Sequence, residues 1–291
     1  MKRISPTGDL AFKKVFASVG NEDVLAGLIN DFFGIVAEEI IIESPYSIQA
    51  YKEVINGEEV PVLRHTLKDV SASLKTADFV SELQISQTRF FDERALYYLL
   101  DRYCQNFNKW LISTDTVTKP NRYSSLKPVY SLNILAYNHF KENNDQDALR
   151  ILEFYDPIRS KSFKQLLRLG FFELQKPHIE TDNQRHWRDY FTIGEVSSKS
   201  PVYIAKASKI IAVSNLMEEE LRVAEIIEKA QAIRDAELST AFLDGKDEGR
   251  VEGKTEVAQM LIKMKIAIED IAIATGLDIP TLQKLKVEAK C

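Results

Sequence analysis

The stretch "LKTADFVSELQISQTR" is the strongest constraint on the fold, because its residues alternate like those of a β-strand. Asp78, Val80, Glu82 and Gln84 share one face, and Phe79, Ser81, Leu83 and Ile85 share the other. Successive side chains of a strand point to opposite faces, so the pattern predicts a strand with one polar face. A strand on the protein surface would account for such a face without any further function.

The segment "LKDVSASL" just upstream reads as a second strand that forms a hairpin with the first, turning at residues 75–76. In this hairpin the residue numbers of two facing residues add up to 151, so Asp69 would lie opposite Glu82. Opposed like charges destabilise a strand pair by roughly a few tenths of a kcal/mol, so two carboxylates here favour a cation between them. The turn residues Lys-Thr lack the Asn-Gly chemistry that fixes a two-residue loop, and one extra loop residue would offset the pair.

A divalent cation is the simplest positive charge for such a pair. Mg²⁺ binds hard oxygen ligands, often one or two carboxylates together with waters, and Mn²⁺ accepts the same donors. Gln84, on the same face as Glu82, would then point at the water shell of the ion. The alternative is that Asp69 and Glu82 are solvated carboxylates on an exposed sheet face.

Composition excludes several other kinds of site. The four histidines show no HxxxH or HxH spacing, and two cysteines form neither a zinc cluster nor a disulfide framework. The net charge of −5 argues against a surface coated for nonspecific nucleic-acid binding but leaves a local basic groove open. The basic N-terminus lacks the apolar segment of a secretory signal, and no apolar run approaches the ~20 residues of a membrane span. We therefore expect a cytoplasmic protein with no membrane contact.

The pattern of helices and strands predicts an α/β layer fold. Helices are expected at residues 9–19, 21–34 and 88–113, and strands at 38–44, 61–74, 77–86, 128–138, 148–156 and 167–175. Ser5 or Thr7 would cap the first helix, and Gly34 would end the second.

The C-terminal quarter reads as helical. We expect a charged connecting helix over residues 216–245 and a helical tail over 246–291, with the glycines of "DGKDEGRVEGKTEV" forming a hinge or interruption. A phosphate-binding loop is excluded there, because three residues rather than four separate Gly249 from Gly253. The segment "AIEDIAIATGLDIPTLQKLK" fits a helix-turn-helix, which could bind DNA or serve in packing or oligomerisation.

Six motifs occur in the order found in the Rpn family of recombination-promoting nucleases and transposases, and the chain resembles this branch of the PD-(D/E)xK superfamily. They are "SPTGDLAFKKVFAS" for D-x-x-F-K-x-x-F, "LINDFF", "DVSAS…FVSELQ" for D…ExQ, "ERALYYLLDRYCQN" for R-x-x-Y-Y, "LNILAYN" and "DEGRVEGKTEVAQMLIKM". The resemblance implies a restriction-endonuclease-like core, a mixed central sheet flanked by helices, over residues 1–215, followed by the helical tail.

The resemblance also implies site residues. Asp69 and Glu82 would be the metal-binding acids, Gln84 would stand where the superfamily has its lysine, and Asp9 would contact the metal or its water. Two departures from the family pattern are Ser81, where an aliphatic residue is usual, and a hairpin without its usual glycine.

The implied activity is that of a bacterial Mg²⁺- or Mn²⁺-dependent endonuclease that hydrolyses DNA phosphodiester bonds in recombination, transposon-like mobility or defence. Arg94 and Tyr98 lie one helical turn apart and could contact the phosphate. Other candidate phosphate contacts are Lys13, Lys14, Arg89, Arg102 and Lys109. A homodimer would supply two active sites for double-strand cleavage. The alternative is a catalytically weak DNA-binding or regulatory protein that retains the fold.

Overall fold

A computed structural model describes residues 3–43, 45–56, 70–112, 123, 126–142, 145–163 and 165–288. The chain divides into two compact units, Met1–Ile227 and Glu228–Cys291. In the part of the chain that the structure describes, no helix is both long enough and apolar enough to cross a bilayer.

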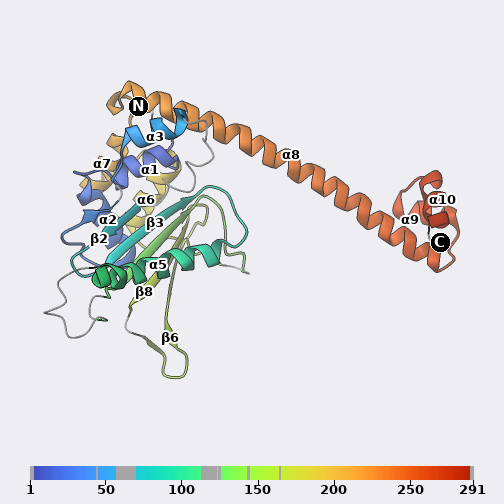
Figure 1. The fold of residues 1–291 in the computed structure, drawn as a ribbon, viewed down its shortest axis with the longest axis horizontal. Helices are drawn as coiled ribbons and strands as arrows, with labels where there is room; N and C mark the ends of the chain where they lie inside the picture. The colour runs from blue at the N-terminus through green and yellow to red at the C-terminus, as the bar shows by residue number, and fades with distance from the viewer. Residues whose placement is uncertain are drawn as a thin grey trace. The chain divides into compact units, whose positions relative to one another are not determined.

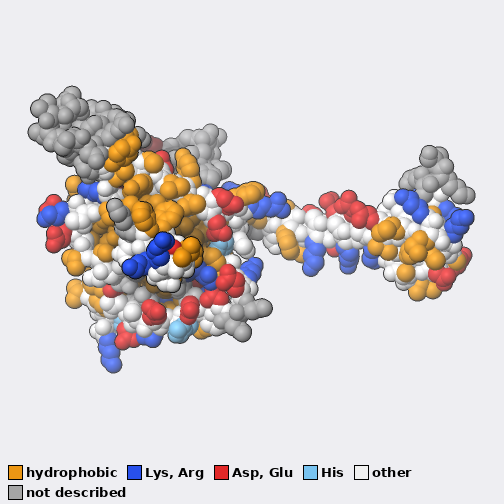
Figure 2. All heavy atoms as spheres, turned by 90° about the horizontal axis from the view of Figure 1, so that it is seen from below, with side chains coloured by type: hydrophobic (Ala, Val, Ile, Leu, Met, Phe, Trp, Pro, Cys, Tyr) orange, Lys and Arg blue, Asp and Glu red, His pale blue; other side chains and the backbone are white. Residues whose placement is uncertain are grey.

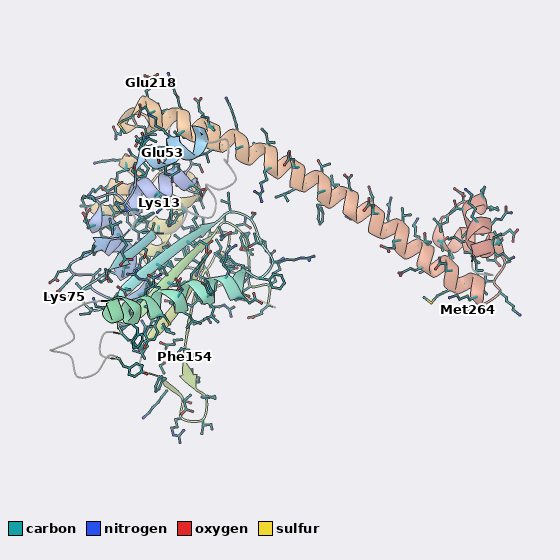
Figure 3. The ribbon with its side chains drawn as sticks, in the orientation of Figure 1. Lys13, Glu53, Lys75, Phe154, Glu218 and Met264 are labelled. Carbon is teal, nitrogen blue, oxygen red and sulfur yellow. The ribbon has the colours of Figure 1, made fainter. Side chains whose placement is uncertain are left out.

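A six-stranded mixed sheet forms the centre of the first unit (Figure 1). Its strands, in spatial order, are β1 (Ile41–Ile42), β2 (Val70–Ser73), β3 (Asp78–Gln84), β4 (Val129–Leu135), β8 (Leu167–Glu173) and β5 (Leu149–Glu153). β3, β4 and β8 run parallel, and the other neighbours are antiparallel. A small hairpin of β6 (Tyr155–Asp156) and β7 (Lys161–Ser162) extends from the sheet, with Phe154 at its base (Figure 3).

Helices cover both faces of the sheet, so the predicted α/β fold class is confirmed. One face packs against α1 (Asp9–Phe16), α2 (Glu22–Phe33), α6 (Asp182–Ile193) and α7 (Val202–Ile210). The core on this side includes Leu28, Phe79, Leu132 and Trp187, all fully buried. The other face packs against α5 (Phe91–Ile112), which crosses the sheet (Figure 1).

Some local expectations are wrong. The first helix has Gly8 as its N-cap without a side-chain cap, because the hydroxyls of Ser5 and Thr7 lie 3.0 Å apart and bond each other. The first strand is only the pair Ile41–Ile42 rather than residues 38–44. The expectations also lacked three helices, α3 (Ile48–Asn56), α6 and α7.

The expected hinge is also wrong, because α8 (Glu218–Lys263) runs unbroken through all three glycines. Glycine costs about 1 kcal/mol in a helix interior relative to alanine, whereas proline, which breaks helices, is absent from this segment.

The second unit contains most of α8 with α9 (Ile268–Thr275) and α10 (Ile279–Glu288), separated by the left-handed Gly276 (φ 66°). The two helices of the predicted helix-turn-helix are therefore present. Ile271 and Leu282 are buried against Ala258 of α8, so both helices have a packing role within this unit.

Candidate active site

The polar face of β3 is buried beneath α5 rather than exposed to solvent. Glu82 and Gln84 are 8% and 6% exposed, and they lie beside Asn133 of β4, which is 1% exposed. Burying a carboxylate is costly unless a positive charge or hydrogen-bond donors accompany it. The explanation by a surface strand therefore fails for Glu82.

The hairpin register agrees with the sequence prediction over its described part. Val70 pairs with Ser81, and Ser71 pairs with Val80, so the residue numbers of facing residues add up to 151, as predicted. The partner acid, Asp69, lies outside the described residues. The pairing of Asp69 with Glu82 therefore stays a prediction, now based on the register of the neighbouring positions.

Two nitrogen partners of Glu82 belong to residues that the structure describes. Its Oε1 accepts a hydrogen bond from the Gln84 side-chain amide and another from Arg94 Nη2, at 3.2 Å. Arg94 belongs to the first turn of α5, and its guanidinium lies over the Phe91 ring, 5.3 Å from the ring centre. A delocalised cation thus contacts the buried acid and offsets part of its burial cost.

A pocket of about 160 Å³ opens beside Glu82. Its lining includes Tyr98, one turn after Arg94 on α5, together with Ser71 of β2 and Asn133 of β4. Helix α5 therefore brings both expected phosphate-contact residues, Arg94 and Tyr98, to the acid of β3.

Tyr137 and Asn133 are site residues that sequence reasoning missed. Tyr137 follows the carboxyl end of β4, and burial raises the pKa of its phenol to about 12, while Arg94 acts in the opposite direction and Glu82 adds to the increase. The sequence places Asn133 within an apolar strand and Tyr137 just after it. Ligand sites gather at the carboxyl ends of parallel strands, so these positions could have indicated the site.

Asp9 lies half-buried at the start of α1, and its backbone carbonyl accepts a hydrogen bond from the Tyr51 hydroxyl at 3.2 Å. Helix α1 packs in the core on the sheet face opposite to α5. The role expected for Asp9 stays a prediction.

Three of the cations expected at phosphate are buried or paired within the fold. The Arg102 side chain is 3% exposed, lies 3.2 Å from Asp78 and bonds Glu43, and it lines the pocket beside Glu82. Lys14 forms an ion pair with Glu220. Lys13 is 4% exposed and lies on α1, in the helical layer (Figure 3).

The donor chemistry beside Glu82 fits a hard divalent cation. The carboxylate of Glu82 and the amide groups of Gln84 and Asn133 carry oxygen atoms of the kind that such an ion prefers. The Arg94 guanidinium contacts the same carboxylate and supplies positive charge there. Within the described ranges, no three or more His, Cys, Asp or Glu side chains gather as a metal cluster. The hairpin register predicts Asp69 as the second carboxylate.

The α/β core thus carries a buried acid, Glu82, on the β2–β3 hairpin, faced by Arg94 from the next helix. The sequence matches the family described as "PD-(D/E)XK nuclease family transposase" over residues 6–241. The chain belongs to this family, which supports a hydrolase acting on nucleic acids and confirms the resemblance to the PD-(D/E)xK nucleases. The sixth motif, residues 247–264, lies beyond the matched range. No curated protein and no solved structure matches the chain.

Proposed function

We propose that this protein is a metal-dependent DNA endonuclease whose active site is the pocket between β3 and α5. The observation that carries the proposal is the buried Glu82, which contacts Arg94 at 3.2 Å and lines a pocket together with Tyr98. Asp69, one position before β2, would be the second acid. Mg²⁺ or Mn²⁺ would bind between the two carboxylates.

A bound divalent ion would act as a Lewis acid and lower the pKa of a water molecule. Glu82 supplies negative charge for that ion from a rigid position in the sheet. Gln84 can orient a water by hydrogen bonding but brings no charge and cannot act as a base. Asp9 is proposed to contact the ion or its water.

Arg94 and Tyr98 are proposed to hold the phosphate. A guanidinium donates two parallel hydrogen bonds to phosphate oxygens and neutralises charge at phosphorus. Contacts of this kind carry little sequence information, so we expect weak sequence preference. The cleavage would serve recombination, transposon-like mobility or defence in a bacterial cytoplasm.

A second candidate function rests on the same contacts. Gln84 replaces the lysine of the superfamily, and both Gln84 and Arg94 bond the carboxylate that would receive the metal. These features would suit a catalytically weak DNA-binding or regulatory protein that has kept the fold.

Nicking of supercoiled plasmid by Asp69→Ala distinguishes the two functions. We expect this variant to lose Mg²⁺-dependent cleavage, because a single carboxylate holds the ion poorly. Asp101→Ala is the matched control, since Asp101 lines the same pocket but lies on α5 and is exposed. Equal cleavage by Asp69→Ala and wild type would remove Asp69 from the site. Absence of cleavage by folded wild type would favour the regulatory function.

A further inference from the structure

The β6–β7 hairpin lies outside the proposed active site and extends from one end of the sheet (Figure 1). It follows β5 and leads into β8. Its base is anchored at Glu153, which accepts hydrogen bonds from Ser162 Oγ at 2.5 Å and from Arg168 Nε at 3.3 Å. Because two strands alone are only marginally stable, this anchor helps to hold the hairpin in place.

Three apolar side chains of the hairpin are exposed to solvent. Phe154 and Phe163 face each other across the two strands, since the Phe163 backbone nitrogen donates to the Phe154 carbonyl at 2.8 Å. They are 56% and 60% exposed, and Ile158 in the turn is 86% exposed. Over the residues that the structure describes, none of the three packs in a core cluster. Grouped apolar side chains of this size indicate a contact surface.

Asp156 fixes the turn that carries Ile158. Its carboxylate accepts hydrogen bonds from the backbone nitrogens of Ile158 and Arg159, at 3.0 and 3.2 Å. Pro157 restricts the backbone between them, because its ring locks φ. Ile158 is therefore held at the tip of a preformed turn, and little conformational entropy is lost when it enters a partner.

The hairpin is basic although the chain as a whole is acidic. Residues 154–164, "FYDPIRSKSFK", contain three Lys or Arg residues and one Asp, whereas the net charge of the chain is −5. The ion pair of Arg159 with Asp156 is exposed and therefore weak, so the guanidinium can bind another anion. Lys161 is exposed as well. Figure 2 views this unit from below, the side toward which the hairpin extends in Figure 1, and shows Lys or Arg side chains beside apolar ones.

We propose that the β6–β7 hairpin inserts into the minor groove of the DNA substrate, with Ile158 as a wedge between base pairs and Arg159 and Lys161 at the flanking phosphates. The inference rests on DNA as the substrate of the proposed nuclease. Duplex DNA combines a polyanionic backbone with apolar base stacks, which matches a basic hairpin with an apolar tip. Apolar side chains that enter the minor groove unstack a base step and kink the duplex by about 20–90°.

One duplex is long enough to contact both the hairpin and the active site. Glu82 is level with Phe171 across the sheet, three residues beyond Arg168, which pairs with Glu153 at the hairpin base. Ile158 lies five residues beyond Glu153. These eight residues span at most about 27 Å along the strands, whereas one turn of duplex is about 34 Å.

Duplex bending tests the wedge without cleavage. A duplex of about 30 base pairs with a donor and an acceptor dye at its ends is titrated with the full-length chain, with Ca²⁺ in place of Mg²⁺. Wild type should bring the ends closer and raise energy transfer, and Ile158→Ser should leave the duplex straight. Val202→Ser is the matched control, because Val202 is an apolar residue of α7 that is 83% exposed, and it should bend the duplex like wild type.

The salt dependence of binding tests the two cations. Arg159→Ala with Lys161→Ala should lower the slope of log affinity against log salt by about 2, because two phosphate contacts are lost. Arg185→Ala with Lys199→Ala removes two exposed cations of the same kinds outside the hairpin and should leave the slope unchanged.

A duplex that wild type leaves straight or does not bind would overturn the proposal, as would equal bending by wild type and Ile158→Ser. Plasmid cleavage by a wild type that does not bend the duplex would overturn the wedge and leave the nuclease function standing. Bending without cleavage would do the reverse. A straight duplex, together with a mass in sedimentation equilibrium that halves in Ile158→Ser, would assign the hairpin to a second copy of the chain instead.

Discussion

Arg94 Nη2 lies 3.2 Å from Glu82 Oε1, so a cation from α5 contacts the buried acid of β3. The Glu82 side chain is 10% exposed and that of Arg94 is 28% exposed, so the arginine lies on the solvent side of the contact. A divalent ion that binds Glu82 would compete with this guanidinium. Arg94 could then bind the phosphate of the substrate.

Arg94→Ala should therefore affect metal binding and cleavage in opposite directions. Mn²⁺ titration should show tighter binding, because a competing positive charge next to Glu82 is gone. Plasmid cleavage should fall by about 10²-fold, because the variant lacks a charge that stabilises the transition state.

Arg185→Ala is the control for this experiment, since Arg185 is an exposed arginine of α6, which packs on the sheet face opposite to α5. It should change neither metal binding nor cleavage by more than a small factor. If Arg94→Ala cleaves as fast as wild type, Arg94 only neutralises Glu82 and has no phosphate role.

Two substitutions of Gln84 test whether it orients the attacking water. Gln84→Ala should slow cleavage by about 10-fold or more, because the donor and acceptor beside Glu82 are lost. Gln84→Lys should keep most activity, because lysine can hold the water and adds positive charge. Single-turnover cleavage at saturating Mg²⁺ separates these effects from metal affinity. If neither substitution changes the rate, Gln84 has no catalytic role.

Arg102 should contribute to stability. Its side chain is 3% exposed and pairs with Asp78, which is fully buried, so Arg102→Met removes a cation that contacts a buried carboxylate. We expect a loss of about 3–5 kcal/mol in the free energy of unfolding, measured by urea titration.

The matched control for Arg102 is Arg159→Met, which removes the exposed ion pair with Asp156. In that pair the side chains are 72% and 35% exposed, so we expect a much smaller loss in the free energy of unfolding than for Arg102→Met. Equal losses for the two variants would contradict the distinction between buried and exposed pairs.

Asp145 should make the free energy of unfolding depend on pH under acidic conditions. Its hydrogen bond with Lys176, assisted by Arg150, lowers its pKa from 3.8 to about 2. A carboxylate with a lowered pKa stabilises the fold above pH 3.8, and this contribution is lost as the pH falls toward 2. Asp145→Asn should be less stable at neutral pH and show a flatter stability profile between pH 4 and 2.

Asp182→Asn, at an acid 88% exposed, is the comparison for that profile and should follow the wild type. The urea concentrations at the midpoint of unfolding, measured at several pH values, give the stability profile of each variant. Parallel profiles for wild type and Asp145→Asn would show that the Lys176 contact does not contribute to folding.

Local periodicity explains which parts of the site were predictable. The alternation along β3 identifies its polar face, and the short turn sets the register with β2, because both depend on neighbouring residues. The pairing of Arg102 with Glu43 was not predictable, since 59 positions separate the two residues in sequence. Arg102 was therefore expected at phosphate, whereas it is buried in an ion pair.

Helix α6 and the unbroken α8 show the same limitation in the fold. Thr181 accepts a hydrogen bond from the Gln184 backbone and caps α6, and Gly194 ends it, so both boundary signals were present. The polar stretch "DNQRH" at its start hides the apolar spacing of Trp187, Tyr190 and Phe191. In α8 the three glycines suggested a hinge, whereas their spacing of four residues is compatible with one helix face.

Cleavage of supercoiled plasmid by wild type and Glu82→Ala, with Mg²⁺ and with EDTA, tests the central claim most directly. Glu93→Ala, at an exposed acid in the first turn of α5, controls for loss of one negative charge. We predict that wild type and Glu93→Ala nick or linearise the plasmid with Mg²⁺, and that Glu82→Ala and EDTA abolish cleavage. Cleavage that persists in Glu82→Ala or in EDTA would contradict the proposed site. Folded wild type that cleaves with neither Mg²⁺ nor Mn²⁺ would contradict the nuclease function itself.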